Sequence, residues 1–135
     1  MPITAFSDAW AAAFRDAVNT NDAYSDAGKS WTNPVALVVE PFTGAPAGAA
    51  VQVELVAGHC LGAAALAPEA VTAPFVLTAD VETWKSIVMG STDPIMAVAR
   101  GKVKLTRGAL GTLMLHAKAA KALVTCAHDI STDWP

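Results

Sequence analysis

The sequence predicts an α+β domain in which a single β-sheet carries helices packed on one face. Apolar residues with helical spacing occupy both ends of the chain, over residues 4–20 and 109–128. The middle of the chain contains short β-branched runs, and the last two of these are separated by a pair of short helices. A length of 135 residues suits one domain with its own hydrophobic core, so we expect a single domain over residues 1–135.

Composition sets a second constraint, because apolar residues make up 53% of the chain and charged residues only 16%. A typical soluble domain has a charged share of about a quarter. The excess therefore predicts either a large buried apolar volume or an apolar surface covered by a ligand or partner. The net charge of −3 argues against nucleic acid as a partner.

The apolar excess does not form a membrane span, since no uninterrupted apolar run reaches the roughly 18 residues that a transmembrane helix needs. The opening stretch MPITAFSDAW has no basic region ahead of an apolar one, so it does not resemble a secretory signal. We therefore expect a cytoplasmic protein in which Cys60 and Cys126 are reduced, buried thiols.

The first half of the chain predicts two helices followed by four strands. Phe6, Trp10, Phe14 and Val18 are spaced four residues apart, which places them on one face of a helix over 4–20. A short helix over 22–30 should end before Asn33-Pro34, because a residue that precedes proline avoids helical angles. Alternation and β-branched content predict strands over 35–42, 50–58, 60–67 and 74–80.

The second half of the chain is punctuated by helix-capping residues. Asp80 should cap a helix that ends at Gly90, and Asp93 with Pro94 should begin another that ends near Gly101. Residues 102–106 alternate charged and apolar side chains and predict a strand with Val103 and Leu105 directed inward. Residues 109–128 should form one long helix.

Residues with reactive side chains do not form a convincing catalytic or metal site. His59 with Cys60 and Cys126 with His128 are the only metal-like set, but their spacing is poor for one ion, so no metal is expected. His116 on the last predicted helix could act as a general base, yet an isolated histidine there is more often structural. We therefore predict neither catalytic residues nor a cofactor.

The remaining signal is a concentration of methionine, tryptophan and aliphatic residues in the predicted helices of the second half. Methionine is common where a surface must accept varied apolar shapes, although each residue alone is also compatible with an ordinary core. Together they predict an apolar ligand cavity between helices and sheet. The predicted lining residues are Leu77, Trp84, Val88, Ile95, Met96, Val103, Leu105, Leu110, Leu113, Met114 and Ala117.

The chain resembles the sterol carrier protein family, the small lipid-binding domain of non-specific lipid-transfer proteins, and its stand-alone prokaryotic-type members in particular. The segments FSDAWAAAFRDAVNTNDAY, VALVVEP, VELVAGHC and AAKALVTCA all resemble family segments. The most specific part is ADVETWKSIVMGSTDPIMAVARGKVKLTRG. Its matching positions are Trp84, Gly90, Asp93, Pro94, Gly101, Lys102 and Gly108. Ala109 departs from the family, which often has Asn or Asp there.

The resemblance implies a five-stranded, mostly antiparallel sheet and an apolar tunnel that holds a fatty acid, acyl-CoA, phospholipid or sterol-like ligand. Lys102, Lys104 and Arg107 could meet an acidic head group, or could simply form a solvated strand face. The alternative hypothesis is an interaction module that forms a homodimer without a lipid cargo. Transient contact with a membrane surface and transfer of the ligand are left open.

Overall fold

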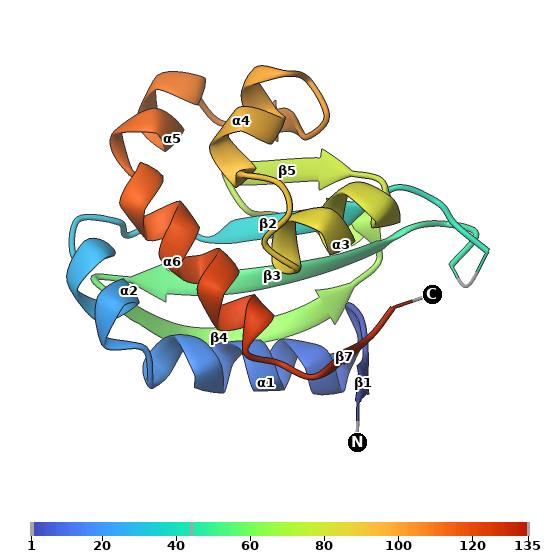
Figure 1. Cartoon of the computed structure of the whole chain (residues 1–135), viewed down its shortest axis with the longest axis horizontal. Helices are drawn as coiled ribbons and strands as arrows, with labels where there is room; N and C mark the ends of the chain where they lie inside the picture. Colours follow the sequence, from blue (N-terminus) through green and yellow to red (C-terminus); the bar gives the residue numbers. More distant parts are fainter. Residues whose placement is uncertain (1, 44, 135) are drawn as a thin grey trace.

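The computed structural model describes residues 2–43 and 45–134 and confirms the α+β fold with a five-stranded sheet (Figure 1). The sheet contains β2 (Val35–Val39), β3 (Ala49–Val56), β4 (His59–Leu66), β5 (Phe75–Ala79) and β6 (Lys104–Arg107). The helices are α1 (Asp8–Asn19), α2 (Asp22–Ala27), α3 (Val81–Val88), α4 (Pro94–Ala99), α5 (Leu110–Leu115) and α6 (Ala117–His128), with a 3₁₀ turn η1 (Pro68–Ala70).

The strand order β4-β3-β2-β5-β6 explains how the sheet is mostly antiparallel yet mixed. The hairpins β2–β3 and β3–β4 are antiparallel, as is the β5–β6 pair, whereas β2 and β5 run parallel. The crossover between parallel strands is therefore residues 67–74, which carry the chain from β4 past β3 and β2 to β5. The helices α3 and α4 connect antiparallel neighbours instead.

Each face of the sheet has its own cover. On one face, Val51, Val53 and Leu55 of β3 pack in the main core with the helices, as their alternation predicts. On the other, Ala36, Val38, Ala50 and Val76 pack against Val71 and Ala73 of the crossover segment.

Side chains on the second face hold the crossover segment in place. The Gln52 side-chain oxygen accepts hydrogen bonds from the Thr72 and Ala73 amides at 3.0 and 3.1 Å. The Arg107 guanidinium donates to the carbonyls of Val71 and Ala73 at 3.2 and 3.3 Å. These partners satisfy backbone groups that a segment without regular structure would otherwise leave unpaired.

The first helix begins later than predicted, at Asp8 rather than at residue 4. Ser7 caps it by accepting a hydrogen bond from the Trp10 amide at 3.2 Å. Phe6 adopts a positive φ of 60°, so its backbone is not helical even though its side chain is buried. The preceding residues form β1 (Ile3–Thr4), which pairs in parallel with β7 (Thr132–Asp133) near the other end of the chain.

The long C-terminal helix is also divided, and the prediction of one helix over 109–128 is wrong at His116. This residue has φ −111° and ψ 29° and separates α5 from α6. His116 Nδ1 donates to the Thr112 carbonyl at 2.9 Å, and the His116 amide bonds the Leu113 carbonyl instead. The side chain thus takes the acceptor that a regular helix would offer to the amide of the same residue.

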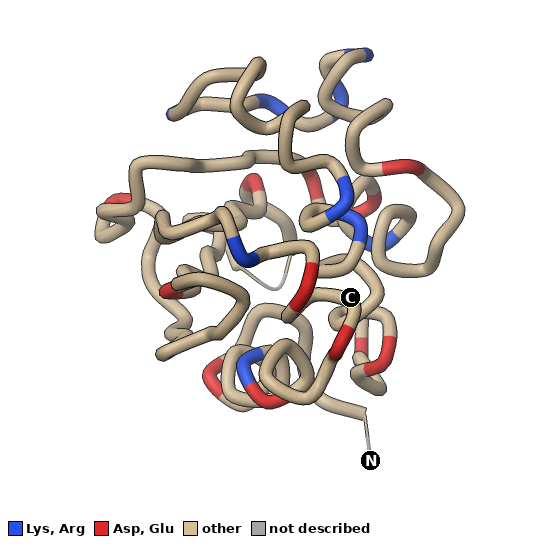
Figure 2. Tube along the Cα trace, turned by 90° about the vertical axis from the view of Figure 1, so that its left-hand side faces the viewer, with Lys and Arg blue, Asp and Glu red and all other residues tan. Residues whose placement is uncertain are grey.

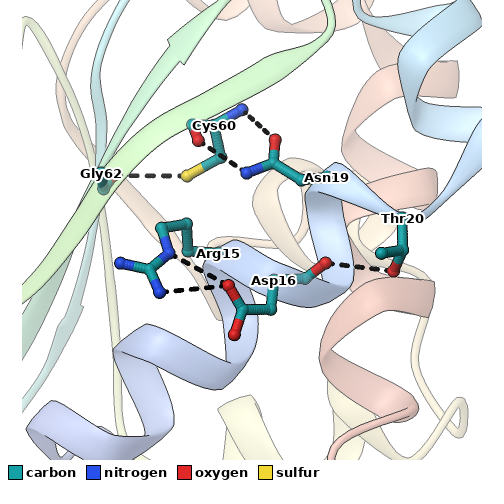
Figure 3. A network of polar contacts seen from close by, with 6 residues as sticks. All are labelled: Arg15, Asp16, Asn19, Thr20, Cys60 and Gly62. Carbon is teal, nitrogen blue, oxygen red and sulfur yellow. Dashed lines mark hydrogen bonds and ion pairs between the residues drawn. The ribbon is translucent and has the colours of Figure 1, made fainter.

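The end of α1 is fixed to the sheet by a side chain that mimics a strand (Figure 3). The Asn19 amide nitrogen donates to the Cys60 carbonyl at 2.9 Å, and its oxygen accepts from the Cys60 amide at 2.8 Å. Because α1 lies along β4, these two bonds set the position of the helix beside the edge of the sheet (Figure 1). That position delivers the aromatic face of α1 to the interior.

Candidate ligand-binding cavity

An apolar cavity of about 100 Å³ lies between the sheet and the helices. Its sheet-side wall comes from β2, β3 and β5, and its other walls come from residues of the helices α1 to α6 and the segments next to them. The lining residues are Phe6, Trp10, Phe14, Tyr24, Trp31, Val35, Leu37, Val53, Phe75, Leu77, Trp84, Ile87, Val88, Pro94, Leu113, His116, Ala119, Ala120, Leu123, Val124 and Ala127. Such walls suit an apolar ligand.

Stacked aromatic rings form the wall supplied by α1 and by Phe6, which precedes the helix. The ring centroids of Phe6 and Trp10 are 5.0 Å apart, and those of Trp10 and Phe14 are 5.3 Å apart and nearly parallel. The Trp10 indole nitrogen donates to the Thr132 hydroxyl at 3.0 Å, so its polar group is satisfied away from the cavity. The wall is therefore rigid and presents ring carbon to the interior.

Four of the predicted residues border this cavity, namely Leu77, Trp84, Val88 and Leu113. Trp84 is oriented by its indole nitrogen, which donates to the Val38 carbonyl at 2.9 Å across the core. Ile95 and Val103 border a smaller adjoining cavity of about 30 Å³, which shares Leu77, Trp84 and Leu113 with the larger one. The sequence pattern and the structure thus meet at the junction of β5, α3 and α5.

The other five predicted residues are not brought to either cavity. Met96, Leu110 and Met114 are about half exposed. Leu105 and Ala117 pack against the core but border neither cavity. Helical spacing identified the apolar turns, but α5 directs only Leu113 inward and leaves its neighbours in solvent. Whether any of these side chains touches a ligand stays a prediction.

Sequence reasoning missed the contribution of the first third of the chain to the cavity. Their spacing places Phe6, Trp10 and Phe14 on one helical face but does not connect that face with a cavity. Tyr24 and Trp31 had not been assigned a role in the cavity, yet both border it. The available signal was the density of large aromatic rings on α1, which is more than a helix of 12 residues needs for docking.

Tyr24 is a cavity-lining residue that also carries a polar group. The residue is fully buried, and its hydroxyl has no hydrogen-bond partner among the described residues. Burial, with smaller contributions from nearby Cys60 and Cys126, raises the pKa of Tyr24 to about 12. The hydroxyl therefore stays protonated at neutral pH and is available to donate a hydrogen bond.

His116 is the second polar residue of the wall and is held in one orientation. Its Nδ1–H donates to the Thr112 carbonyl at 2.9 Å, which leaves Nε2 as the acceptor of the neutral ring. The edge of the ring meets Trp31, with centroids 4.9 Å apart. The histidine contacts a backbone carbonyl here, and the described residues give it no hydrogen bond to a carboxylate or hydroxyl side chain. This setting gives no support to a general base.

The remaining candidates lie away from the cavity. Lys102, Lys104 and Arg107 are exposed, and Arg107 is engaged by the crossover segment. Within the described part of the chain, no three side chains among His, Cys, Asp and Glu gather as a metal site. Cys60 and Cys126 are free and buried, and burial raises the pKa of both thiols, that of Cys126 to about 11.

No helix formed by the described residues is both long and apolar enough to cross a bilayer.

Comparison with known proteins gives matches only among solved structures, since no protein-family model and no curated protein matches the sequence. A crystal structure of sterol carrier protein 2 superposes with TM-score 0.90 and 37% identity, over 93% of this chain and 98% of that chain. A protein from Thermus thermophilus, described as possibly a sterol carrier protein, superposes with a TM-score of 0.88 and 36% sequence identity. The match covers 95% of this chain and 90% of that chain. Sterol carrier protein 2 from Yarrowia lipolytica, in its apo form, shares the fold with a TM-score of 0.56 and 14% sequence identity. That match covers 87% of this chain and 88% of that chain.

Proposed function

The chain belongs to the sterol carrier protein family, and on this premise we propose that it binds a hydrophobic ligand with an alkyl chain or sterol-like body in the cavity between sheet and helices. The observation that carries the proposal is the almost wholly apolar wall, built from aromatic rings on α1 and small alanines on α6. Burial of each methylene contributes about 0.8 kcal/mol, so apolar area alone can hold an alkyl chain.

The size of the cavity implies that the walls move when a long ligand enters. A volume of about 100 Å³ is less than the roughly 150 Å³ that accommodates benzene in an engineered protein cavity. The helix α5 is a short wall segment that begins without a side-chain cap at Ala109 and is separated from α6 at His116. We therefore infer that α5, which carries Leu113 on its inner side, moves outward to admit the ligand.

The polar end of the ligand is expected to be small where it meets the wall. The Tyr24 hydroxyl can donate one hydrogen bond and His116 Nε2 can accept one. A sterol hydroxyl, which both donates and accepts, matches both groups, whereas a fatty acid carboxylate, which only accepts, matches the Tyr24 hydroxyl alone. The head group of an acyl-CoA or a phospholipid is too large for the interior and would remain outside.

A tryptophan at position 113 tests the proposal. Leu113 borders both cavities and is 7% exposed, whereas the adjacent Met114 borders neither and is 50% exposed. We expect Leu113→Trp to lower the affinity for fatty acid by about tenfold or more, because the larger ring fills the space of several methylenes. Displacement of a bound fluorescent fatty acid measures this affinity. The control Met114→Trp should bind as the unmodified protein does.

Ala120→Leu repeats the test if Leu113→Trp fails to fold, since Ala120 borders both cavities from α6. Equal binding by the unmodified protein and by folded variants of both positions would overturn the proposal. Mass spectrometry of the gently purified protein identifies the ligand. Absence of any bound lipid, together with no fatty acid binding, would favour an interaction module.

A further inference from the structure

The second half of the chain carries an uneven distribution of charge. Residues 94–128 contain six of the nine lysines and arginines and none of the twelve aspartates and glutamates. The chain as a whole has a net charge of −3, so the rest of the protein is strongly acidic. Figure 2 shows this in space, because blue segments lie along the end of the molecule formed by α4 and α5, and most red segments lie on the rest of the molecule.

The same end of the molecule exposes apolar side chains. The described residues include seven large apolar side chains that are exposed, and four of them belong to α4 and α5. These four are Met96, Leu110, Met114 and Leu115, the last with 85% exposure. We call the four apolar residues and the exposed basic residues Arg100, Lys102, Lys104 and Lys118 the basic tip.

The basic side chains of this tip are available for an external partner. Lys102 and Lys104 form no ion pair with any of the described residues, and neither do Arg100 and Lys118. By contrast, Lys121 is already paired with Asp93 at 3.4 Å, so we leave it out of the tip. Exposed apolar side chains and unpaired cations at one end of the molecule match the interface of an anionic bilayer, in which lipid tails lie beneath phosphate groups.

We propose that the basic tip is a docking surface for the anionic face of a lipid bilayer. Leu115 and Met114 enter the interfacial region while Lys102, Lys104 and their neighbours contact lipid phosphates. Acidic residues on the rest of the protein are repelled by the same surface, which fixes the orientation. The docked helix is α5, whose inner residue Leu113 borders the cavity, so a docked molecule turns this wall toward the membrane. Docking itself does not depend on the content of the cavity.

Charge reversal tests the electrostatic part of the docking proposal. Binding is measured as the fraction of protein that sediments with vesicles of phosphatidylcholine alone, or of phosphatidylcholine mixed equally with phosphatidylglycerol. We expect the protein to bind the mixed vesicles preferentially and to release them as salt is raised. Lys102→Glu/Lys104→Glu should weaken this binding by about tenfold or more. Lys29→Glu/Lys85→Glu changes the net charge equally but lies outside residues 94–128, and it should retain most of the binding.

Truncation of an exposed leucine tests the apolar part. Leu115→Ser should weaken binding to the mixed vesicles by about tenfold, because a leucine side chain no longer leaves water. Leu61→Ser is the matched control, since Leu61 is 71% exposed but lies on β4 at the other edge of the sheet. Both leucines are exposed, so neither substitution should unfold the protein.

Three outcomes would overturn the proposal: equal binding to neutral and mixed vesicles, equal losses in the paired variants, or no binding at all. Salt-sensitive dimers in sedimentation velocity, without vesicle binding, would instead make a second copy of the chain the occupant of the tip. Fatty acid binding by Lys102→Glu/Lys104→Glu should equal that of the unmodified protein. Failure of docking is thereby distinguished from failure of the cavity proposal.

Discussion

The environment of Tyr24 is set by a glycine four residues later. A Cβ atom on Gly28 would lie 2.6 Å from the Tyr24 ring and 2.9 Å from its hydroxyl. Gly28 has a negative φ of −90°, so the glycine is needed there for space and not for backbone freedom. The fold thus makes room for a buried ring and leaves its hydroxyl without a partner, which is destabilising unless a ligand supplies one.

The substitution Tyr24→Phe separates the effect of that hydroxyl on the stability of the fold from its effect on ligand affinity. Without ligand, we expect the free energy of unfolding to rise by about 1 kcal/mol, because an unsatisfied buried group is removed. Fatty acid affinity should fall by about five- to tenfold if the hydroxyl binds the polar end, whereas affinity for a hydrocarbon of equal length should not change. Urea unfolding and displacement titrations measure the two effects. Equal losses for both ligands would exclude a hydrogen bond from Tyr24.

Capping residues show how well single positions can specify the ends of helices. Asp80 accepts from the Thr83 amide at 2.8 Å, and Asp93 accepts from the Ile95 and Met96 amides at 2.9 and 3.2 Å. Both caps were predicted from sequence and are confirmed. Ala109, which stands where the family often has Asn or Asp, begins α5 without such a bond. The helix that brings Leu113 to the cavity therefore begins without a side-chain cap.

The Asp93 cap can be isolated by two substitutions. Asp93→Ala should lower the free energy of unfolding by about 1 kcal/mol, whereas Asp93→Asn should cost only a few tenths, because asparagine caps equally well. The hydrogen bond from the Met96 amide is the main cause that lowers the pKa of Asp93. The contribution of the charge is therefore complete above the ordinary pKa near 4 and is lost as the pH falls through the lowered value.

Urea unfolding of both Asp93 variants from neutral to acidic pH measures these effects. Equal losses for alanine and asparagine at neutral pH would show that the ion pair with Lys121, and not the cap, is the stabilising contact.

Sequence patterns predicted the helices and strands well and the position of the cavity poorly. Strand alternation and capping depend on neighbouring residues, so the five strands, α3 and α4 could be predicted. The break at His116 depends on a side chain that bonds the Thr112 carbonyl, which periodicity does not contain. Leu113 and Met114 have similar character, and only the packing of α5 determines which one borders the cavity. Cavities arise where packing is incomplete, and no local pattern marks that.

At the scale of the whole molecule, the buried thiol of Cys126 and the buried phenol of Tyr24 limit the stability of the fold at alkaline pH. Burial raises the pKa of Cys126 to about 11 and that of Tyr24 to about 12, from ordinary values near 8.5 and 10. The folded state therefore keeps protons that the unfolded chain releases. The stabilising effect is complete below about 8.5 and is lost as the pH rises through the raised values.

We accordingly expect the free energy of unfolding to decline from about pH 8.5 upward, with the part due to Cys126 missing in Cys126→Ala. The chain has one tyrosine, so tyrosinate absorbance reports Tyr24 alone. Its midpoint should lie well above 10 in the folded protein and near 10 in urea. A folded protein that ionises near pH 10 would contradict the burial of this hydroxyl.

The division of charge between residues 94–128 and the rest of the chain also gives the molecule a permanent electric dipole. Near a charged plane, such a body experiences a torque before it experiences contact, over distances of about a Debye length. Protein molecules that approach an anionic membrane from solution would therefore arrive with the basic tip facing it, and few collisions would involve the acidic side. The charge asymmetry therefore orients the protein during its approach to the membrane. The association rate constant should depend on ionic strength more steeply than the dissociation rate constant of the bound protein does.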